Sequence, residues 1–239
     1  MRRNIDVSFL ILIVILAFNS LRRGAFDDPA GWLMNILMLL PAIIIGLSFH
    51  EYAHAVTAYK MGDPTPKMQG RVTINPMAHI DWLGFAALVF CGFGWGVPVE
   101  INPANFRNRR KGELLVSLAG VAMNLLIAVI FAVVAKLLVV FLGYSFLSGS
   151  FGSILWTMIM YIIQINLVLM IFNLIPCPPL DGFSVISEIF NIKHTGFYWT
   201  LYRYGDWILI ALIIFGITGM IISPCVDFFF ELLQRFILL

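Results

Sequence analysis

The sequence predicts an all-α polytopic membrane protein with about six transmembrane helices and a re-entrant or interfacial β-hairpin region near residues 67–104. Of its 239 residues, 61% are hydrophobic and only 12% are charged, whereas a soluble domain carries about 25% charged and about 45–50% apolar residues. The mean hydropathy is +0.94. One globule of this size cannot bury so much apolar surface, and several apolar runs approach the length of about 20 residues that a helix needs to cross a bilayer.

The composition and the charge exclude several classes of protein. A disordered tail and an ordinary soluble enzyme are both far more polar. The 15 Lys and Arg residues against 13 Asp and Glu residues give a net charge of +2, which lacks the excess of positive charge typical of nucleic-acid-binding proteins. The cysteines Cys91, Cys177 and Cys225 form no CxxC pair, so we interpret them as reduced thiols rather than as a disulfide scaffold.

The first two apolar runs predict two membrane helices. Residues 5–18 are flanked by a pair of arginines on each side. A signal peptide has a similar pattern, but no small-x-small cleavage site precedes the second pair, which favours a retained helix. Residues 32–60 form a longer run that ends before the helix breakers Gly62, Pro64 and Pro66.

Residues 67–104 have a different pattern. Polar and apolar residues alternate at 71–74, which is a strand signal, and residues 97–101 resemble a second strand. The apolar piece between them, at 83–93, is too short to span. Backbone of this kind is tolerated at membrane depth where it is buried in protein or lines a wet cavity, which predicts the re-entrant or interfacial hairpin.

Four further apolar stretches follow, at residues 113–142, 153–175, 206–223 and 226–239. The last of these either spans the membrane or lies in its interface. A Pro-rich break at 176–179 precedes a short helix near 183–192. No repeat or separate soluble segment interrupts the chain, so we expect residues 1–239 to form one membrane-embedded domain. The distribution of Lys and Arg places the N-terminus and the end of the 32–60 helix on the cytoplasmic side.

A motif in the second helix points to metal chemistry. In His50-Glu51-Tyr52-Ala53-His54, the two histidines are four residues apart, so both imidazoles share one helix face and can bind one Zn²⁺ with Glu51 beside it. A zinc-bound water has a pKa near about 7, and a neighbouring glutamate can take its proton and pass it to the leaving amine. The alternative, two hydrogen-bonded core histidines with a paired glutamate, is disfavoured because each unpartnered ionisable group in an apolar helix costs several kcal/mol.

A zinc ion held by two histidines needs a third protein ligand, and Asp181 is the best candidate. It follows the break at 173–180 in a helix that arrives at the cytoplasmic side, so it lies at a similar depth to His50 and His54. Taken alone, an acid beside Gly182 in such a break also suits a helix N-cap. Beside the HExxH motif, the ligand interpretation is favoured.

The HExxH helix followed by Asn-x-x-Pro-x-Pro-Pro-Leu-Asp-Gly at 173–182 resembles the site-2 protease family of intramembrane zinc metalloproteases. Further matches at 70–81 and 102–107 extend the resemblance over roughly residues 45–185. It implies a membrane-embedded peptidase that cuts transmembrane segments of protein substrates, with Zn²⁺ on His50, His54 and Asp181 and with Glu51 as the base. The chain is most similar to the compact members that lack an inserted PDZ domain. We accordingly expect a multi-pass protein of a prokaryotic cell membrane whose partners are lipid and transmembrane substrates, while the oligomeric state is left open.

Three further residues are candidates for contacts with the substrate. Residues 119–124 resemble the family's Gly-Pro-x-x-Asn element, with Val121 where proline is usual. Asn124 and Asn173 are candidate donors to the substrate backbone or to the developing oxyanion, and interhelical hydrogen bonding is the alternative for each. For His79, a hydrogen bond within the hairpin is favoured over a role as a second transition-state donor.

Two other functions compete with proteolysis. A membrane transporter with an intramembrane ion path predicts further charges at mid-depth, and Lys136 alone clearly qualifies. A catalytically silent relative that binds membrane segments is the second alternative, and the intact set of His50, Glu51, His54 and Asp181 argues against it. For a protease, we expect the substrate to unwind and to pair with an edge of the predicted strands.

Overall fold

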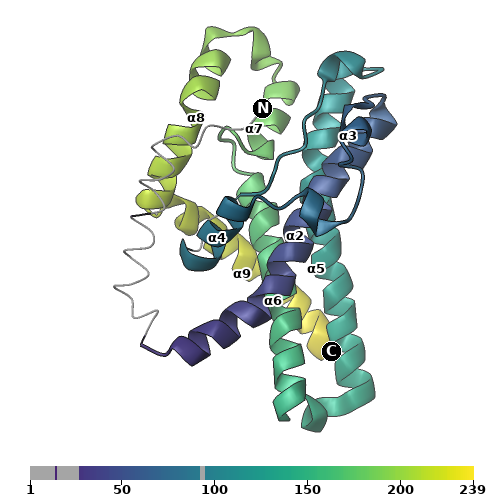
Figure 1. The fold of residues 1–239 in the computed structure, drawn as a ribbon, viewed down its shortest axis with the longest axis vertical. Coiled ribbons are helices and arrows are strands. Elements are labelled where there is room, and N and C mark those ends of the chain that lie inside the picture. The colour runs from purple at the N-terminus through teal and green to yellow at the C-terminus, as the bar shows by residue number, and fades with distance from the viewer. Residues whose placement is uncertain (1–13, 15–26, 92–94) are drawn as a thin grey trace.

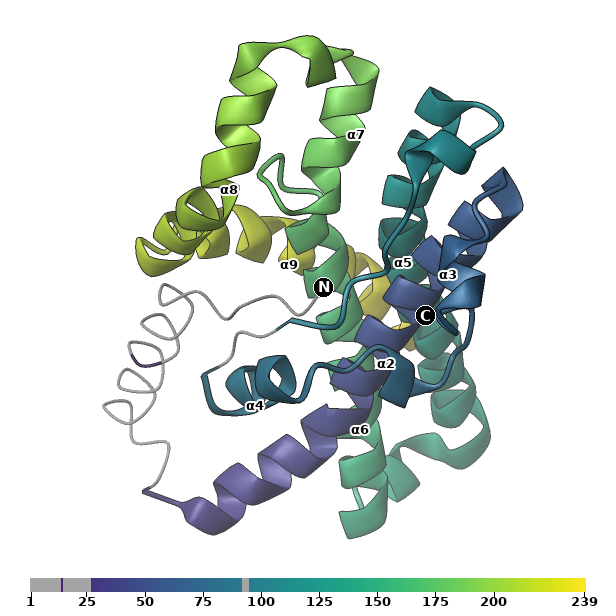
Figure 2. The same ribbon diagram turned by 45° about the horizontal axis from the view of Figure 1, so that its top comes forward.

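The computed structural model describes residue 14, residues 27–91 and residues 95–239 (Figure 1). The predicted membrane helix at 5–18 therefore lies outside the described residues, apart from residue 14. The described part is built of helices joined by short loops and one long extended segment (Figure 1, Figure 2). Its α-helices are α2 Pro29–Met61, α3 Thr65–Met68, α4 Trp82–Cys91, α5 Arg109–Leu147, α6 Ser150–Asn173, α7 Asp181–Ile189, α8 Gly196–Ile214 and α9 Ile217–Leu238. Its 3-10 helices are η1 Pro76–Ala78, η2 Pro103–Asn105 and η3 Ile192–His194.

The core forms where the long helices α5 and α6 pack along each other. Ala128, Ala132 and Ala135 lie on one face of α5, all without exposed surface, and contact the buried side chains of Ile163 and Leu167 on α6. Small residues at intervals of three and four let the two backbones approach closely. Helix α9 closes this core from a third side, whereas α7 and α8 run side by side as a helical pair beyond the end of α6 (Figures 1 and 2).

The helices confirm the class of a helical polytopic membrane protein. Within the described residues, α2, α5 and α6 are each long and apolar enough to cross a membrane, and the pair α8 and α9, bent by 72°, adds a fourth crossing if it counts as one span. The expected helix at 206–223 is wrong as a single element. Gly216, with a left-handed φ of 71°, divides this stretch, so that α8 ends before it and α9 begins after it.

The region near residues 67–104 contains no strand ladder among its described residues. A single antiparallel bridge joins Ile80 to Gly96, and the Val97 N–H donates to the His79 carbonyl at 2.8 Å. The alternating residues at 71–74 form local turns instead, because Thr73 bonds back to Arg71 within the same loop. The short helix α4 lies at the apolar piece that is too short to span.

A buried carboxylate ties the end of α2 to the extended segment that follows α4. Asp63 has no exposed surface, and its side chain accepts hydrogen bonds from the Thr65 N–H and hydroxyl, the Asn102 N–H at 2.7 Å and the Asn105 amide at 2.8 Å. Burial by itself raises the pKa of Asp63, but the hydrogen bonds from Asn105, Thr65 and Asn102 outweigh it and hold the pKa below its ordinary value. Asp63 is therefore a charged anchor for the 102–105 loop.

Replacing Asp63 by alanine should lower the free energy of unfolding by about 2–3 kcal/mol, because several donors lose a charged acceptor. Since the pKa is lowered in the folded state, this contribution is complete above the ordinary pKa of about 3.9 and is lost as the pH falls further. Thermal unfolding of the detergent-solubilised protein checks it. The difference in Tm between wild type and Asp63→Ala should be constant above about pH 5 and shrink below about pH 4, and a difference unaffected by acid would contradict the anchor.

Candidate metal centre

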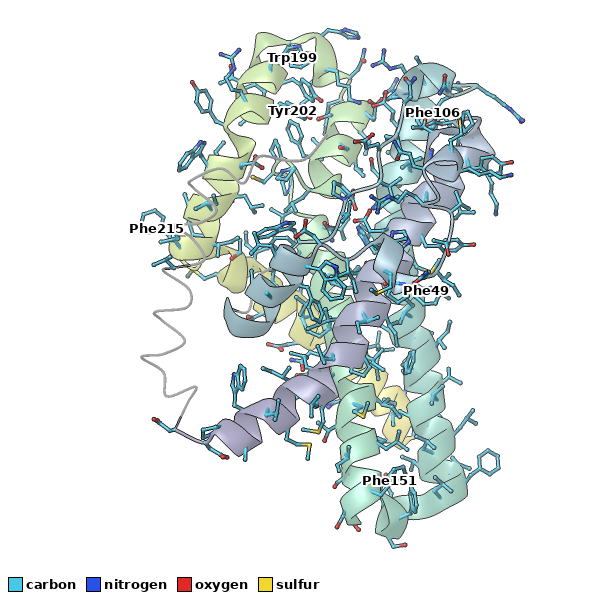
Figure 3. All side chains as sticks on the ribbon, in the orientation of Figure 1. Phe49, Phe106, Phe151, Trp199, Tyr202 and Phe215 are labelled. Carbon is cyan, nitrogen blue, oxygen red and sulfur yellow. The ribbon has the colours of Figure 1, made fainter. Side chains whose placement is uncertain are left out.

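Helices α2 and α7 bring three predicted ligands together in the middle of the molecule. The Nε2 atoms of His50 and His54 lie 2.9 Å apart, and each lies 3.3 Å from Oδ2 of Asp181, the first residue of α7. Both histidines are buried. In Figure 3, the labelled Phe49, which precedes His50, marks the level of this cluster on α2. The spacing of four residues on α2 and the Pro-rich break before α7 thus converge on one point, as the sequence predicts.

The atoms that face one another here are all hydrogen-bond acceptors. The His54 Nδ1 atom is 2.8 Å from the carbonyl oxygen of Val116, which can only accept, so Nδ1 carries a proton, and in the neutral imidazole, the form that binds a metal, Nε2 presents its lone pair. His50 has the same tautomer, because its Nδ1 donates to Oδ1 of Asn124 at 2.6 Å. Asp181 Oδ2 is buried, and no hydrogen-bond donor among the described residues reaches it. Three converging acceptors without a donor repel one another unless a cation lies between them.

The donor set fits zinc. Two imidazole nitrogens and one carboxylate oxygen are a typical ligand set of a catalytic zinc site, which keeps its fourth position open. Four tetrahedral ligands at about 2.0–2.1 Å from a zinc ion are about 3.3 Å from one another. The separations of 2.9 to 3.3 Å among His50, His54 and Asp181 are close to this value.

A chain of buried amides fixes the orientation of His50. The Asn166 side-chain N–H₂ donates to the carbonyl of Ile162 at 2.8 Å, which turns Asn166 Oδ1 toward Asn124. The Asn124 N–H₂ group then donates to Asn166 Oδ1 at 2.9 Å and to the carbonyl of Gly46 at 3.2 Å. Its own Oδ1 is thereby aimed at His50. Because both backbone carbonyls can only accept, the direction of every hydrogen bond in the chain is determined.

This chain changes the interpretation of Asn124. The sequence leaves two roles open, a donor to the substrate and an interhelical hydrogen bond; in the structure, Asn124 is fully buried and its amide group donates to Asn166 and Gly46. Its contacts are those of a positioning residue for His50. Sequence reasoning missed Asn166, whose signal was present: an asparagine in the middle of an apolar helix, a kind of residue that is costly in a membrane without a partner.

The close approach of α5 to the imidazoles requires a glycine. A Cβ atom added to Gly120 would lie 2.5 Å from both His50 Cε1 and His54 Nε2, well inside contact distance. The imidazoles cannot swing away, because Asn124 and Val116 hold them from the same helix. Gly120 is thus the point on α5 that lets one helix support both histidines.

Glu51 lies beside the ligands and faces a cavity. Its Oε2 atom accepts a hydrogen bond from the backbone N–H of Val99 at 3.1 Å. The cavity has a volume of ≈ 470 Å³ and reaches His50 and Glu51. Its walls come from α2, α6, α8 and the extended segment, through residues that include Leu47, Trp95, Pro98, Phe172, Tyr202 and Leu209. Tyr202 is labelled on α8 in Figure 3.

The two other substrate-contact candidates lie in different surroundings. Asn173 lines the cavity, and its amide N–H₂ donates to Leu169 one turn earlier in α6. His79 is fully buried, and its Nε2 is 2.7 Å from the carbonyl oxygen of Thr73. His79 is not among the residues that line the cavity. Its contacts are those of the hairpin-region hydrogen bond that the sequence favours.

A helical membrane protein with an HExxH helix, a converging aspartate and a cavity at the glutamate has the arrangement of a membrane-embedded zinc hydrolase. Comparison with known proteins agrees with this class. The chain is 41% identical over 152 residues to the Bacillus subtilis protein named "Putative zinc metalloprotease YwhC", a match that covers 63% of this chain and 68% of that protein. It is 26% identical over 239 residues to "Putative zinc metalloprotease Rip2" of Mycolicibacterium smegmatis, covering 96% of this chain and 85% of the relative.

Rip2 of Mycobacterium tuberculosis is 26% identical over 170 residues, which is 69% of this chain and 61% of that protein. No family model and no solved structure matches the chain. From the relative that is 41% identical, and from the site motifs, the chain belongs to the site-2 protease family of intramembrane zinc metalloproteases.

Substituting Gly120 by alanine should abolish stoichiometric zinc binding, because the added methyl group overlaps both imidazoles. Metal analysis of the purified protein measures this. The matched control is Gly219→Ala in α9, where the new Cβ meets no atom within 4 Å and should leave zinc content unchanged. Full zinc occupancy in Gly120→Ala would contradict the geometry.

Substituting Asn124 by alanine should weaken zinc binding about 10- to 100-fold, because the His50 Nδ1–H loses the acceptor that fixes its tautomer. Competition with a chelator measures the affinity. Asn173→Ala is the comparison, since that amide bonds within its own helix and its loss should leave the affinity near wild type. If the two variants lost zinc equally, the amide chain would have no particular role.

Proposed function

We propose that this protein hydrolyses peptide bonds within or near the transmembrane segments of other membrane proteins, as a zinc endopeptidase of the site-2 protease type. The observation that carries the proposal is the convergence of His50, His54 and Asp181 next to Glu51, with His50 and Glu51 lining a cavity between membrane helices. The relatives are named as zinc metalloproteases, which supports the same chemistry.

Each residue at this site has a distinct task in the proposed reaction. A zinc ion held by His50, His54 and Asp181 would act as a Lewis acid toward the scissile carbonyl and toward a water molecule. Glu51 takes a proton from the attacking water and passes it to the leaving amine. The Val99 N–H holds Oε2 of Glu51, which leaves Oε1 for the water. Asn173, on the cavity wall, donates to the substrate carbonyl.

The cavity favours an unwound, apolar substrate. Most of its lining side chains are apolar, which suits the residues of a transmembrane segment. A helical substrate keeps its amides in internal hydrogen bonds, so it must unwind before its carbonyls can be attacked. We propose that the unwound chain pairs with the segment 97–101 next to Glu51. The N–H groups of Val97 and Val99 are already bonded to His79 and Glu51, so neither is available to the substrate.

We further propose a membrane arrangement in which α2, α5 and α6 each cross the bilayer and the bent pair α8 and α9 forms one further crossing. Residues 67–104 re-enter from the cytoplasmic side. His54 is six residues from Lys60, or about 9 Å along the helix, so the metal centre lies inside the membrane near the cytoplasmic face. The matched relatives are bacterial, which supports a prokaryotic cell membrane. The cytoplasmic N-terminus is inferred from the distribution of Lys and Arg along the chain.

Substituting Glu51 by glutamine should leave zinc binding intact and abolish cleavage, because glutamine cannot take a proton from water. The assay is cleavage of a tethered transmembrane substrate in membranes, with zinc content measured on the same preparations. His54→Ala is the matched variant that should lose both zinc and cleavage.

Cleavage that persists in Glu51→Gln would sink the assignment of the base. A wild-type protein without stoichiometric zinc would overturn the metal centre. Zinc binding without turnover by the wild-type protein toward any transmembrane substrate would favour the silent, segment-binding alternative.

A further inference from the structure

The three ligands of the candidate metal centre are held by different elements. The imidazoles of His50 and His54 are oriented by the hydrogen bonds that Nδ1–H donates to Asn124 Oδ1 and to the Val116 carbonyl, both on α5. Asp181 is the first residue of α7, and its Oδ2 lies 3.3 Å from each Nε2. The position of this oxygen therefore depends on where the start of α7 lies.

The start of α7 is fixed by close packing against the end of α6. A Cβ atom added to Gly182 would lie only 2.2 Å from the carbonyl oxygen of Leu174. This contact sets the distance between the two helix ends, and the Phe183 ring stacks on Tyr198 of α8 with their centroids 5.4 Å apart. Both contacts lie in the first turn of α7, so the direction of the helix also depends on contacts further along it.

A cluster of charged residues provides such contacts at the far end of α7. Lys193, in η3, forms ion pairs with Glu188 of α7 and with Glu113 of α5. Arg110 of α5 donates to the carbonyl oxygens of Glu188 and Ile189 at 3.0 Å each, where the helix has no internal donors left. We call Arg110, Glu113, Glu188 and Lys193 the α5–α7 clamp. Arg109 adds an exposed ion pair to Glu113 at 2.9 Å.

The clamp and the metal centre lie on the same faces of the same two helices. Asp181 and Glu188 are seven residues apart, which is two turns, or about 10 Å, along one face of α7. On α5, Glu113 precedes Gly120 by the same seven residues, and Gly120 contacts the imidazoles. The two helices are therefore joined at two levels, the ligands at one and the clamp at the other.

The clamp is strong because its charges are sheltered. Glu113 and Glu188 are 7% and 6% exposed, so water and salt screen their ion pairs far less than a surface pair. Burial by itself lowers the pKa of Lys193, but its bonds to the two glutamates outweigh this and raise the pKa above its ordinary value. Lys193 thus stays protonated, and its removal leaves the buried carboxylate of Glu188 without its ion pair and Glu113 with Arg109 alone.

We propose that the α5–α7 clamp is the positioning device of the third zinc ligand, with Lys193 as its central residue. It holds α7 in the direction that brings Asp181 onto the imidazoles of His50 and His54. The inference rests on the proposed function in one respect, that Asp181 binds the metal.

The test compares zinc affinity and thermal stability in the purified full chain, using chelator competition and thermal unfolding. Lys193→Met should weaken zinc binding about 10- to 100-fold, the range found for residues that orient ligands. Lys193→Arg keeps the charge and can reach both glutamates, so it should restore affinity to near the wild-type value. Arg110→Ala leaves no buried charge unpaired and should weaken zinc binding by a smaller factor, which keeps the test available if Lys193→Met does not fold.

A destabilising variant far from α7 serves as the matched control. Val226→Ala in α9 removes buried side-chain volume from the α5–α6–α9 core and should lower the Tm without altering zinc affinity. Wild-type affinity in both Lys193→Met and Arg110→Ala would overturn the proposal, as would an equal loss of zinc in Val226→Ala. A wild-type chain that binds no zinc would instead refute the metal centre, so the two failures are distinguishable.

Discussion

The structure depends on one constraint: the two histidines of α2 must both present unprotonated Nε2 atoms. Because both side chains are buried, hydrogen bonds within the protein must set the tautomer. That requires a fixed acceptor at each Nδ1, and both acceptors come from α5, the Val116 carbonyl and the Asn124 side chain. Helix α5 must therefore approach α2 closely over two turns. Gly120 makes this approach possible, and Asn166 on α6 completes the polar chain.

The packing of the three long helices follows from the same requirement. Buried amides in a membrane are tolerated when every donor and acceptor has a partner. The chain from Ile162 to His50 uses carbonyls of α2 and α6 as its fixed ends, so α2, α5 and α6 are joined at one height. The alanine face of α5 then packs α6 along the rest of its length. The hydrogen-bonded amides at one level and the close apolar packing at another together define a single arrangement of α2, α5 and α6.

How much of this can be predicted depends on the distance in sequence between the partners. The pairing of His50 with His54 follows from helix periodicity, and the Pro-rich break before Asp181 indicates a third ligand at the right depth. The contacts of Asn166 with Asn124 and of Lys193 with Glu113 join residues 42 and 80 positions apart, and no local pattern encodes them. The alternation of polar and apolar residues at 71–74 predicts a strand. In the structure, the Thr73 N–H bonds instead to the Arg71 carbonyl within the same loop. Likewise, Gly216, with its left-handed φ, separates α8 from α9 inside an apolar run whose hydropathy shows no break.

The hydrogen bond from Val99 to Glu51 comes from the main chain, and this has a consequence for how the site can vary among sequences. Every residue except proline carries the same N–H group, so the side chain at position 99 can change freely while the contact to the base persists. Position 99 can therefore look unimportant in an alignment of relatives and still be constrained. The constraint acts on the path of the backbone, which Asp63 anchors three residues further along at Asn102. Among relatives, conservation that preserves this contact should thus be seen at Asp63 rather than at position 99.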